Sequence, residues 1–172
     1  MQPHVMLLLA AALLSISTET LGIAGRFVER KTTAGRLLGF VHEYDGVQAE
    51  VYLGVPFAQP PVGSLRLEYP RPVLPWSGVR NATKLPPWCI QFWFADPRLE
   101  ARQHSEDCLY MNLLIPYHVK NVKRPYPVLV WVHGGSYQVN GANMFPLDGS
   151  TRNLVSRGIA LAFVNYRLGP IG

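Results

Sequence analysis

Two uninterrupted apolar runs constrain the fold of this chain most strongly. Val128–Val132 (VLVWV) and Ile159–Val164 (IALAFV) contain no polar residue. A strand with one face in water alternates apolar and polar residues, whereas a continuous run is typical of a strand covered on both faces. Between the runs, Thr151–Arg157 predicts a helix, with Ser150 as its N-cap and Gly158 in the left-handed position past its end. Strand, glycine loop, helix and strand in this order predict an α/β fold.

A smaller antiparallel unit is expected earlier in the chain. Residues 36–41 and 49–53 are rich in apolar side chains, and the Asp-Gly pair at 45–46 is a turn signal between them. Residues 109–115 (LYMNLLI) predict a further strand that ends at Pro116. Since few residues follow the second apolar run, we expect the strands of both runs to be partly exposed in this chain. We also expect the chain to be a truncated portion of a larger fold.

The amino terminus predicts secretion. Residues 1–24 read as a signal peptide, because Val5–Leu14 is apolar throughout yet too short to span a bilayer; the alternative is an uncleaved anchor. The protein is then secreted or lies on the extracellular face of the plasma membrane. In that oxidising environment the two cysteines, Cys89 and Cys108, are expected to form a disulfide, and Asn81 of Asn-Ala-Thr to be glycosylated.

Charge and spacing argue against several classes of function. The net charge is +5 over 172 residues, but the basic residues form no stripe interleaved with aromatics, so nucleic-acid binding is not expected. Neither a metal-ligand spacing nor a phosphate-binding glycine motif occurs. We therefore expect no metal and no cofactor.

The motif with the clearest chemistry is the His-Gly-Gly at 133–135, directly after the first apolar run. Acyl transfer requires hydrogen-bond donors aimed at the oxygen that becomes negative, and glycines let backbone N–H groups approach it closely. Such a loop supplies part of the oxyanion hole in α/β-hydrolases. Taken alone, the motif could also be an ordinary glycine turn.

Several further blocks accompany this motif, and together they resemble the type-B carboxylesterases, a family that includes cholinesterases and the adhesion proteins called neuroligins. The resemblance covers residues 34 to 172. The blocks, in the order of the family, are YLGVPFA at 52–58, PVG at 61–63, WSGVRNAT at 76–83, SEDCLYMN at 105–112, HGG at 133–135 and NYRLG at 165–169.

The resemblance implies an α/β-hydrolase fold, with a small antiparallel start and a central, mostly parallel sheet. Residues 25–172 would be the amino-terminal portion of an incomplete carboxylesterase domain. Cys89–Cys108 would be the first disulfide of the family, and Arg66 and Glu106 a buried structural ion pair beside it.

The same resemblance assigns the oxyanion loop. Gly134 and Gly135 match its glycines, and Ser136 stands in place of the usual third glycine, where its backbone N–H could be a third donor. Ser136 is not the nucleophile, because it lies outside a Gly-x-Ser-x-Gly elbow. The nucleophile and the rest of the triad are absent from these residues.

The implied function is hydrolysis of carboxylic esters by a serine esterase through an acyl-enzyme, with small esters as substrates; the chain itself is expected to be inactive. The alternative is a non-catalytic, neuroligin-like adhesion or receptor ectodomain with a cell-surface protein as partner. The Ser136-Tyr137 pair favours this alternative, because it is similar to the neuroligin loop.

Overall fold

The computed structural model describes residues 26–91, 103–121 and 124–172. The predicted signal peptide at 1–24 lies outside the described residues, so it stays a prediction. No helix within these three ranges is long and apolar enough to cross a membrane.

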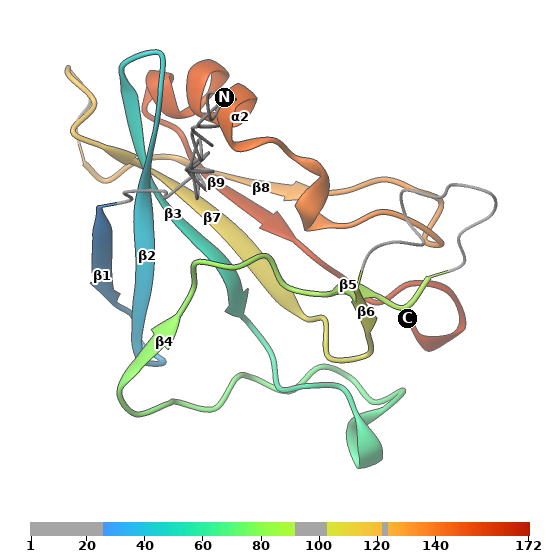
Figure 1. Cartoon of the computed structure of the whole chain (residues 1–172). Helices are drawn as coiled ribbons and strands as arrows, with labels where there is room; N and C mark the ends of the chain where they lie inside the picture. The colour runs from blue at the N-terminus through green and yellow to red at the C-terminus, as the bar shows by residue number, and fades with distance from the viewer. Residues whose placement is uncertain (1–25, 92–102, 122–123) are drawn as a thin grey trace, which may run out of the picture.

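One mixed sheet organises the chain (Figure 1), with its strands in the order β1-β2-β3-β7-β9-β8. The strands are β1 (Phe27–Lys31), β2 (Arg36–Tyr44), β3 (Val47–Pro56), β7 (Tyr110–Tyr117), β9 (Ala160–Val164) and β8 (Val128–Val132). Neighbours along this path are antiparallel, except β9 and β8, which run parallel. A short strand, β4 (Val79–Asn81), pairs in parallel with β2. The antiparallel start and the α/β character are as predicted. Along the described path the sheet is mostly antiparallel rather than mostly parallel, and β8 and β9 form its parallel part.

The hairpin between β2 and β3 confirms the predicted Asp-Gly turn. Tyr44 pairs with Val47, so Asp45 and Gly46 alone make the connection. Both have positive φ, 51° and 71°. A two-residue loop with two left-handed residues matches the twist of the flanking strands, which fixes the register of the hairpin.

Strand β7 is longer than predicted, because Pro116 does not end it. Pro116 pairs with Ala49 of β3, and the strand continues to Tyr117. On its other side, β7 pairs with β9 only from Met111 to Leu114. Proline has no backbone N–H to donate. Because β9 does not pair with β7 at Pro116, no hydrogen bond to β9 is lost there.

The connection from β8 to β9 contains helix α2 (Leu147–Asn153) and the 3-10 turn η3 (Val155–Arg157). The helix begins earlier than predicted, after Pro146, whose extended backbone ends the preceding segment. Ser150 therefore lies inside α2, and its prediction as N-cap is wrong. Gly158 ends the element in the left-handed conformation, with φ 77°, as predicted.

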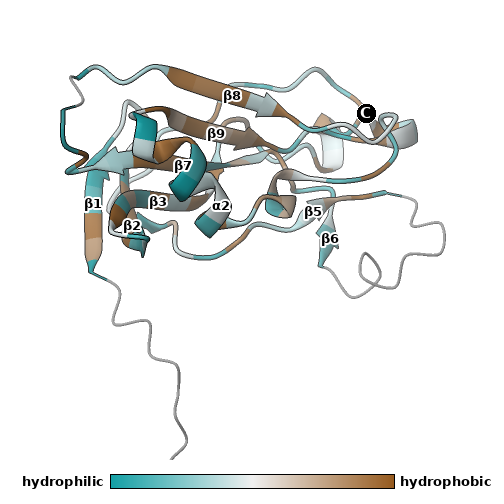
Figure 2. Cartoon of the chain, turned by 90° about the horizontal axis from the view of Figure 1, so that it is seen from above, coloured by the Kyte–Doolittle hydropathy of each residue, from teal (hydrophilic) through white to brown (hydrophobic). Residues whose placement is uncertain are grey.

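The two apolar strands differ in burial. Strand β9 is buried along four of its five residues, as expected for a strand covered on both faces. Strand β8 is not: Val128, Val130 and Val132 are 63%, 60% and 64% exposed. The expectation that the apolar strands are partly exposed in this chain therefore holds for β8, which is the edge of the sheet and pairs only with β9 within the described residues. It does not hold for β9, which is buried. Figure 2 shows this apolar strand along the outer edge of the sheet.

The main core lies where the sheet packs against α2 and η3. Its members come from elements far apart in the sequence and are completely or almost completely buried: Ala49, Val51, Leu114, Val155, Leu161 and Phe163. Burial of each large apolar side chain stabilises the fold by roughly 1.5–3 kcal/mol, so this core holds the central strands together.

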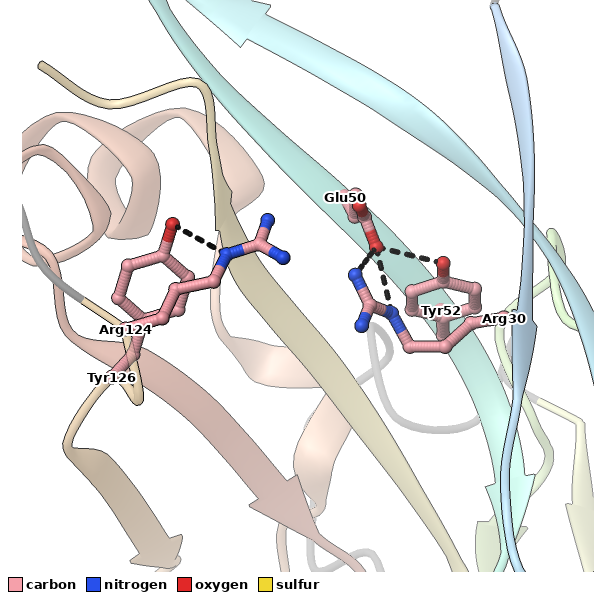
Figure 3. Close-up of polar contacts among 5 residues, drawn as sticks. All are labelled: Arg30, Glu50, Tyr52, Arg124 and Tyr126. Carbon is pink, nitrogen blue, oxygen red and sulfur yellow. Dashed lines mark hydrogen bonds and ion pairs between the residues drawn. The ribbon is translucent and has the colours of Figure 1, made fainter.

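A polar cluster joins β1 to β3 across β2 (Figure 3). Arg30 donates hydrogen bonds to Glu50 Oε2 from Nε (2.9 Å) and Nη2 (2.5 Å), and the Tyr52 hydroxyl donates to the same oxygen (2.9 Å). Gly39 of β2 makes room for the Tyr52 ring, because a Cβ there would lie 2.6 Å from it. Burial, with the carboxylate of Glu50 as a further cause, raises the pKa of Tyr52 to about 12.

The remaining elements are short. They are η1 (Gly63–Leu65), β5 (Trp88–Cys89), β6 (His104–Ser105), η2 (Ala142–Met144) and η4 (Gly169–Ile171). Strands β5 and β6 form a separate parallel pair beside the main sheet (Figure 1).

Candidate active site

The loop that joins β8 to η2, residues 133–141, is called the glycine loop below. It turns sharply directly after the strand. Gly135, Ser136 and Tyr137 are three successive residues with positive φ, at 127°, 55° and 59°. The turn is closed by the N–H groups of Gln138 and Val139, which both donate to the Gly135 carbonyl at 2.9 and 3.1 Å.

Gly134 and Gly135 have different roles in this loop. A Cβ on Gly135 would lie 2.1 Å from the Val139 carbonyl oxygen, so the turn itself requires glycine there. A Cβ on Gly134 would meet nothing within 4 Å. Gly134 therefore faces open space, and a reacting group could approach its backbone.

The Gly134 carbonyl accepts hydrogen bonds from within the loop. Asn140 Nδ2 donates to it at 3.2 Å, and His133 Nδ1 lies 2.9 Å from it. Because the N–H and C=O of a trans peptide point in opposite directions, the Gly135 N–H points away from both donors. The N–H groups of Gly134, Gly135 and Ser136 donate to no acceptor within ranges 26–91, 103–121 and 124–172.

His133, at the start of the glycine loop, is buried and packs on Tyr166. Its ring is 5% exposed and stacks on Tyr166, with ring centroids 4.3 Å apart, and the Tyr166 hydroxyl donates to the His133 carbonyl at 2.5 Å. Burial lowers the pKa of His133, and the contact with the Gly134 carbonyl only partly opposes this effect. The ring is therefore neutral at pH 7, and since Nδ1 faces a carbonyl acceptor, the proton is on Nδ1.

The predicted disulfide is confirmed. Cys89 and Cys108 are bonded, with their Cα atoms 5.0 Å apart, and both are buried. The bond lies beside the β5–β6 pair. Two residues after Cys89, the Gln91 side chain contacts the backbone of Asn140 in the glycine loop. Neither amide residue was predicted from the sequence. The Asn-Gly pair at 140–141 is a turn signal and the one local pattern that indicates an unusual backbone there.

Arg66 and Glu106 are in contact, but on the surface. Arg66 Nε lies 2.9 Å from Glu106 Oε2, and the two side chains are 54% and 31% exposed. Within the described residues the pair is therefore not buried as expected. Arg66 follows η1 in a loop outside the core, where water solvates both charges. An exposed pair of this kind contributes about 0–1 kcal/mol.

Asn81 lies at the exposed end of β4. Its Oδ1 accepts hydrogen bonds from the Thr83 N–H at 3.0 Å and from the Thr83 hydroxyl at 2.7 Å. The side chain is accessible to solvent, and its glycosylation stays a prediction.

Metal binding finds no support among the described side chains. No group of three or more His, Cys, Asp or Glu residues in this part of the chain could hold a metal ion.

A mixed sheet in which an apolar strand leads into a glycine loop with free backbone donors defines the class of α/β-hydrolase folds. Within this class, the chain belongs to the carboxylesterase family, whose model matches residues 27–172.

Three curated relatives illustrate the similarity. Liver carboxylesterase 1F of Rattus norvegicus is 39% identical over 153 residues, covering 82% of this chain and 27% of the relative. Cocaine esterase of Oryctolagus cuniculus is 36% identical over 83% of this chain and 28% of the relative. Liver carboxylesterase of Sus scrofa is 38% identical over 82% and 26%. The chain thus spans 26–28% of the length of these relatives.

Proposed function

We propose that this chain supplies the oxyanion-binding loop of a carboxylic ester hydrolase. The observation that carries the proposal is that the backbone N–H groups of Gly134, Gly135 and Ser136, shortly after β8, have no acceptor in the described part of the chain. The names of the relatives, which are esterases, support the same reaction.

In the proposed mechanism, a serine attacks the ester carbonyl and forms an acyl-enzyme. The carbonyl oxygen becomes negative in the tetrahedral intermediate, and the loop donors stabilise it. The loop does this without rearrangement, because Gly135 is held in its turn by the bonds to its carbonyl. Substrates are small esters that reach the open side of Gly134.

The nucleophile is not among the 172 residues, which contain no Gly-x-Ser-x-Gly sequence. We propose that the chain is the amino-terminal portion of the hydrolase domain and that it does not hydrolyse esters alone. We also propose that residues 1–24 direct it to the secretory route. Ester hydrolysis is preferred to the adhesion alternative because the relatives carry esterase names.

The test is a chimera in which residues 27–172 replace the matching segment of rat liver carboxylesterase 1F. The relative supplies the rest of the domain, and this chain supplies the glycine loop. We expect the secreted chimera to hydrolyse p-nitrophenyl acetate and to react with a fluorophosphonate probe. A well-secreted chimera that reacts with the probe but does not turn over the ester would contradict the proposal.

Two variants of the chimera test the loop itself. Gly135→Ala should abolish turnover, because its Cβ collides with the Val139 carbonyl at 2.1 Å. Gly134→Ala has free space within this chain, so the chimera should still be secreted. Its methyl group enters the space in front of the donors, so activity should fall by about 10²–10³, the typical effect of losing one oxyanion donor. Equal activities of Gly134→Ala and the parent would contradict this assignment.

A further inference from the structure

We propose that Asn140, held by Gln91, is a positioning residue that aims the Gly135 N–H at the reacting oxygen. This inference rests on the proposed function, since it assigns a role within the same oxyanion loop. Neither residue lies in one of the sequence blocks that resemble the carboxylesterase family.

Asn140 has an unusual backbone conformation. Its φ is 86°, in the left-handed region that most side chains avoid. Asparagine enters this region more readily than other side chains, because its short amide can form local hydrogen bonds. Here the amide does so, and its Nδ2 donates to the Gly134 carbonyl at 3.2 Å.

That hydrogen bond acts on the peptide between Gly134 and Gly135. A side chain is absent at both positions, and nothing lies within 4 Å of where a Gly134 Cβ would be. Packing therefore leaves the Gly134 side of this peptide plane unsupported, although the Gly135 side lies close to the Val139 carbonyl. The carbonyl has two lone pairs, and Asn140 Nδ2 and His133 Nδ1 face it at 3.2 and 2.9 Å. With both in place, the Gly135 N–H is held on the opposite side.

Gln91 holds the backbone of Asn140 in turn. Its Oε1 accepts from the Asn140 N–H at 2.8 Å, and its Nε2 donates to the Asn140 carbonyl at 3.2 Å. Nε2 also donates to the Cys89 carbonyl at 3.2 Å. Gln91 is 8% exposed, so water competes little for these bonds. A continuous set of hydrogen bonds thus leads from the disulfide segment to the oxyanion loop.

Two substitutions separate the side chain of Asn140 from its backbone. Asn140→Gly keeps the left-handed backbone and removes the amide. Asn140→Asp keeps the shape but replaces the Nδ2 donor by an oxygen, which repels the Gly134 carbonyl. Two matched controls repeat these changes at left-handed positions in exposed turns: Asp45→Gly (φ 51°) and Asn121→Asp (φ 62°).

The first measurement does not depend on activity. Hydrogen exchange by mass spectrometry on the full chain reports the N–H groups of Gln138 and Val139, which close the glycine loop. We expect Asn140→Gly to exchange these amides about threefold to tenfold faster, the factor that matches one hydrogen bond. Both controls should exchange them at the parental rate. Parental exchange in both Asn140 variants would overturn the proposal.

The second measurement uses the esterase chimera. We expect Asn140→Gly to lower kcat about threefold to tenfold with KM unchanged, since the interaction is used in the transition state. Asn140→Asp should lower kcat further at pH 8 and recover relative to the parent as pH falls, because the introduced carboxyl group, once protonated, can donate to the Gly134 carbonyl. A merely structural role would not produce that recovery.

The two measurements keep the proposals apart. If the amides exchange faster but kcat stays at the parental value, the positioning role is overturned. If the parent chimera is well secreted and reacts with the probe but has no esterase activity, the proposed function fails, and the exchange rates alone decide whether Asn140 orders the loop.

Discussion

The cluster of Arg30, Glu50 and Tyr52 provides a direct test of how the first strand is held in the fold. Glu50 is 6% exposed, and one of its oxygens accepts all three hydrogen bonds of the cluster. Glu50→Ala removes that acceptor. The Arg30 side chain is 38% exposed and can turn to water, whereas Tyr52 is completely buried and its hydroxyl loses its partner. The cost of this change therefore falls mainly on the tyrosine.

The magnitude follows from these contacts. A lost hydrogen bond to a charged group costs about 1.5–3 kcal/mol, and a buried hydroxyl left without a partner costs about 1–3 kcal/mol. The two terms overlap, so we expect Glu50→Ala to lower the free energy of unfolding by about 3 kcal/mol. Glu50→Gln keeps an acceptor for both donors and should lower it by about 1 kcal/mol. In the double variant with Tyr52→Phe the hydroxyl is gone, so the two losses should not add and should couple by about 1 kcal/mol.

Urea denaturation of the purified full chain, followed by tryptophan fluorescence, measures these values. The slopes against urea concentration must agree for the comparison to hold. Glu43→Ala is the control: Glu43 is exposed and, among the described residues, is bonded only to Gln48, so the change should stay within about 0.5 kcal/mol. A Glu50→Ala protein within about 1 kcal/mol of the parent would refute the reasoning, because the buried hydroxyl would then have found another partner.

Two further predictions concern the site and its surroundings. Arg66→Ala should lower the free energy of unfolding by less than about 1 kcal/mol in the same urea assay, because its pair with Glu106 is exposed; a loss above about 3 kcal/mol would show a buried pair. Burial lowers the pKa of His133, so the unfolded state binds a proton near pH 6.5 that the folded state does not, and stability should fall as pH drops below about 6.5. His133→Gln should reduce this fall between pH 7.5 and 5.5, and an unchanged pH dependence would contradict the buried, neutral ring.

Local signals were the ones that sequence reasoning interpreted correctly. The Asp-Gly turn at 45–46 and the left-handed Gly158 depend on the conformational preferences of the residues themselves. Ser150 is also a good N-cap residue, yet the rigid backbone of Pro146 placed the helix start before it. Local preference alone does not decide between two nearby start signals.

Features that depend on distant neighbours were harder to predict. Both apolar runs were expected to be partly exposed, but burial depends on what packs against each strand. Within the described residues β8 is an edge and is exposed, whereas β9 lies between β7 and β8 and is buried. The contact of Gln91 with Asn140 joins residues 49 positions apart through backbone atoms. Backbone acceptors have no sequence signature, so this part of the site could be found only in the structure.

The double hydrogen bonding of the Gly134 carbonyl has an electronic consequence. Donors from Asn140 and His133 draw electron density toward the carbonyl oxygen, and the amide resonance of the peptide passes this polarisation to the Gly135 nitrogen. The Gly135 N–H then carries a larger partial positive charge than an isolated amide. Cooperative strengthening of this kind amounts to about 10–30% per bond. Residues that never touch a substrate can therefore tune the strength of a donor as well as its direction.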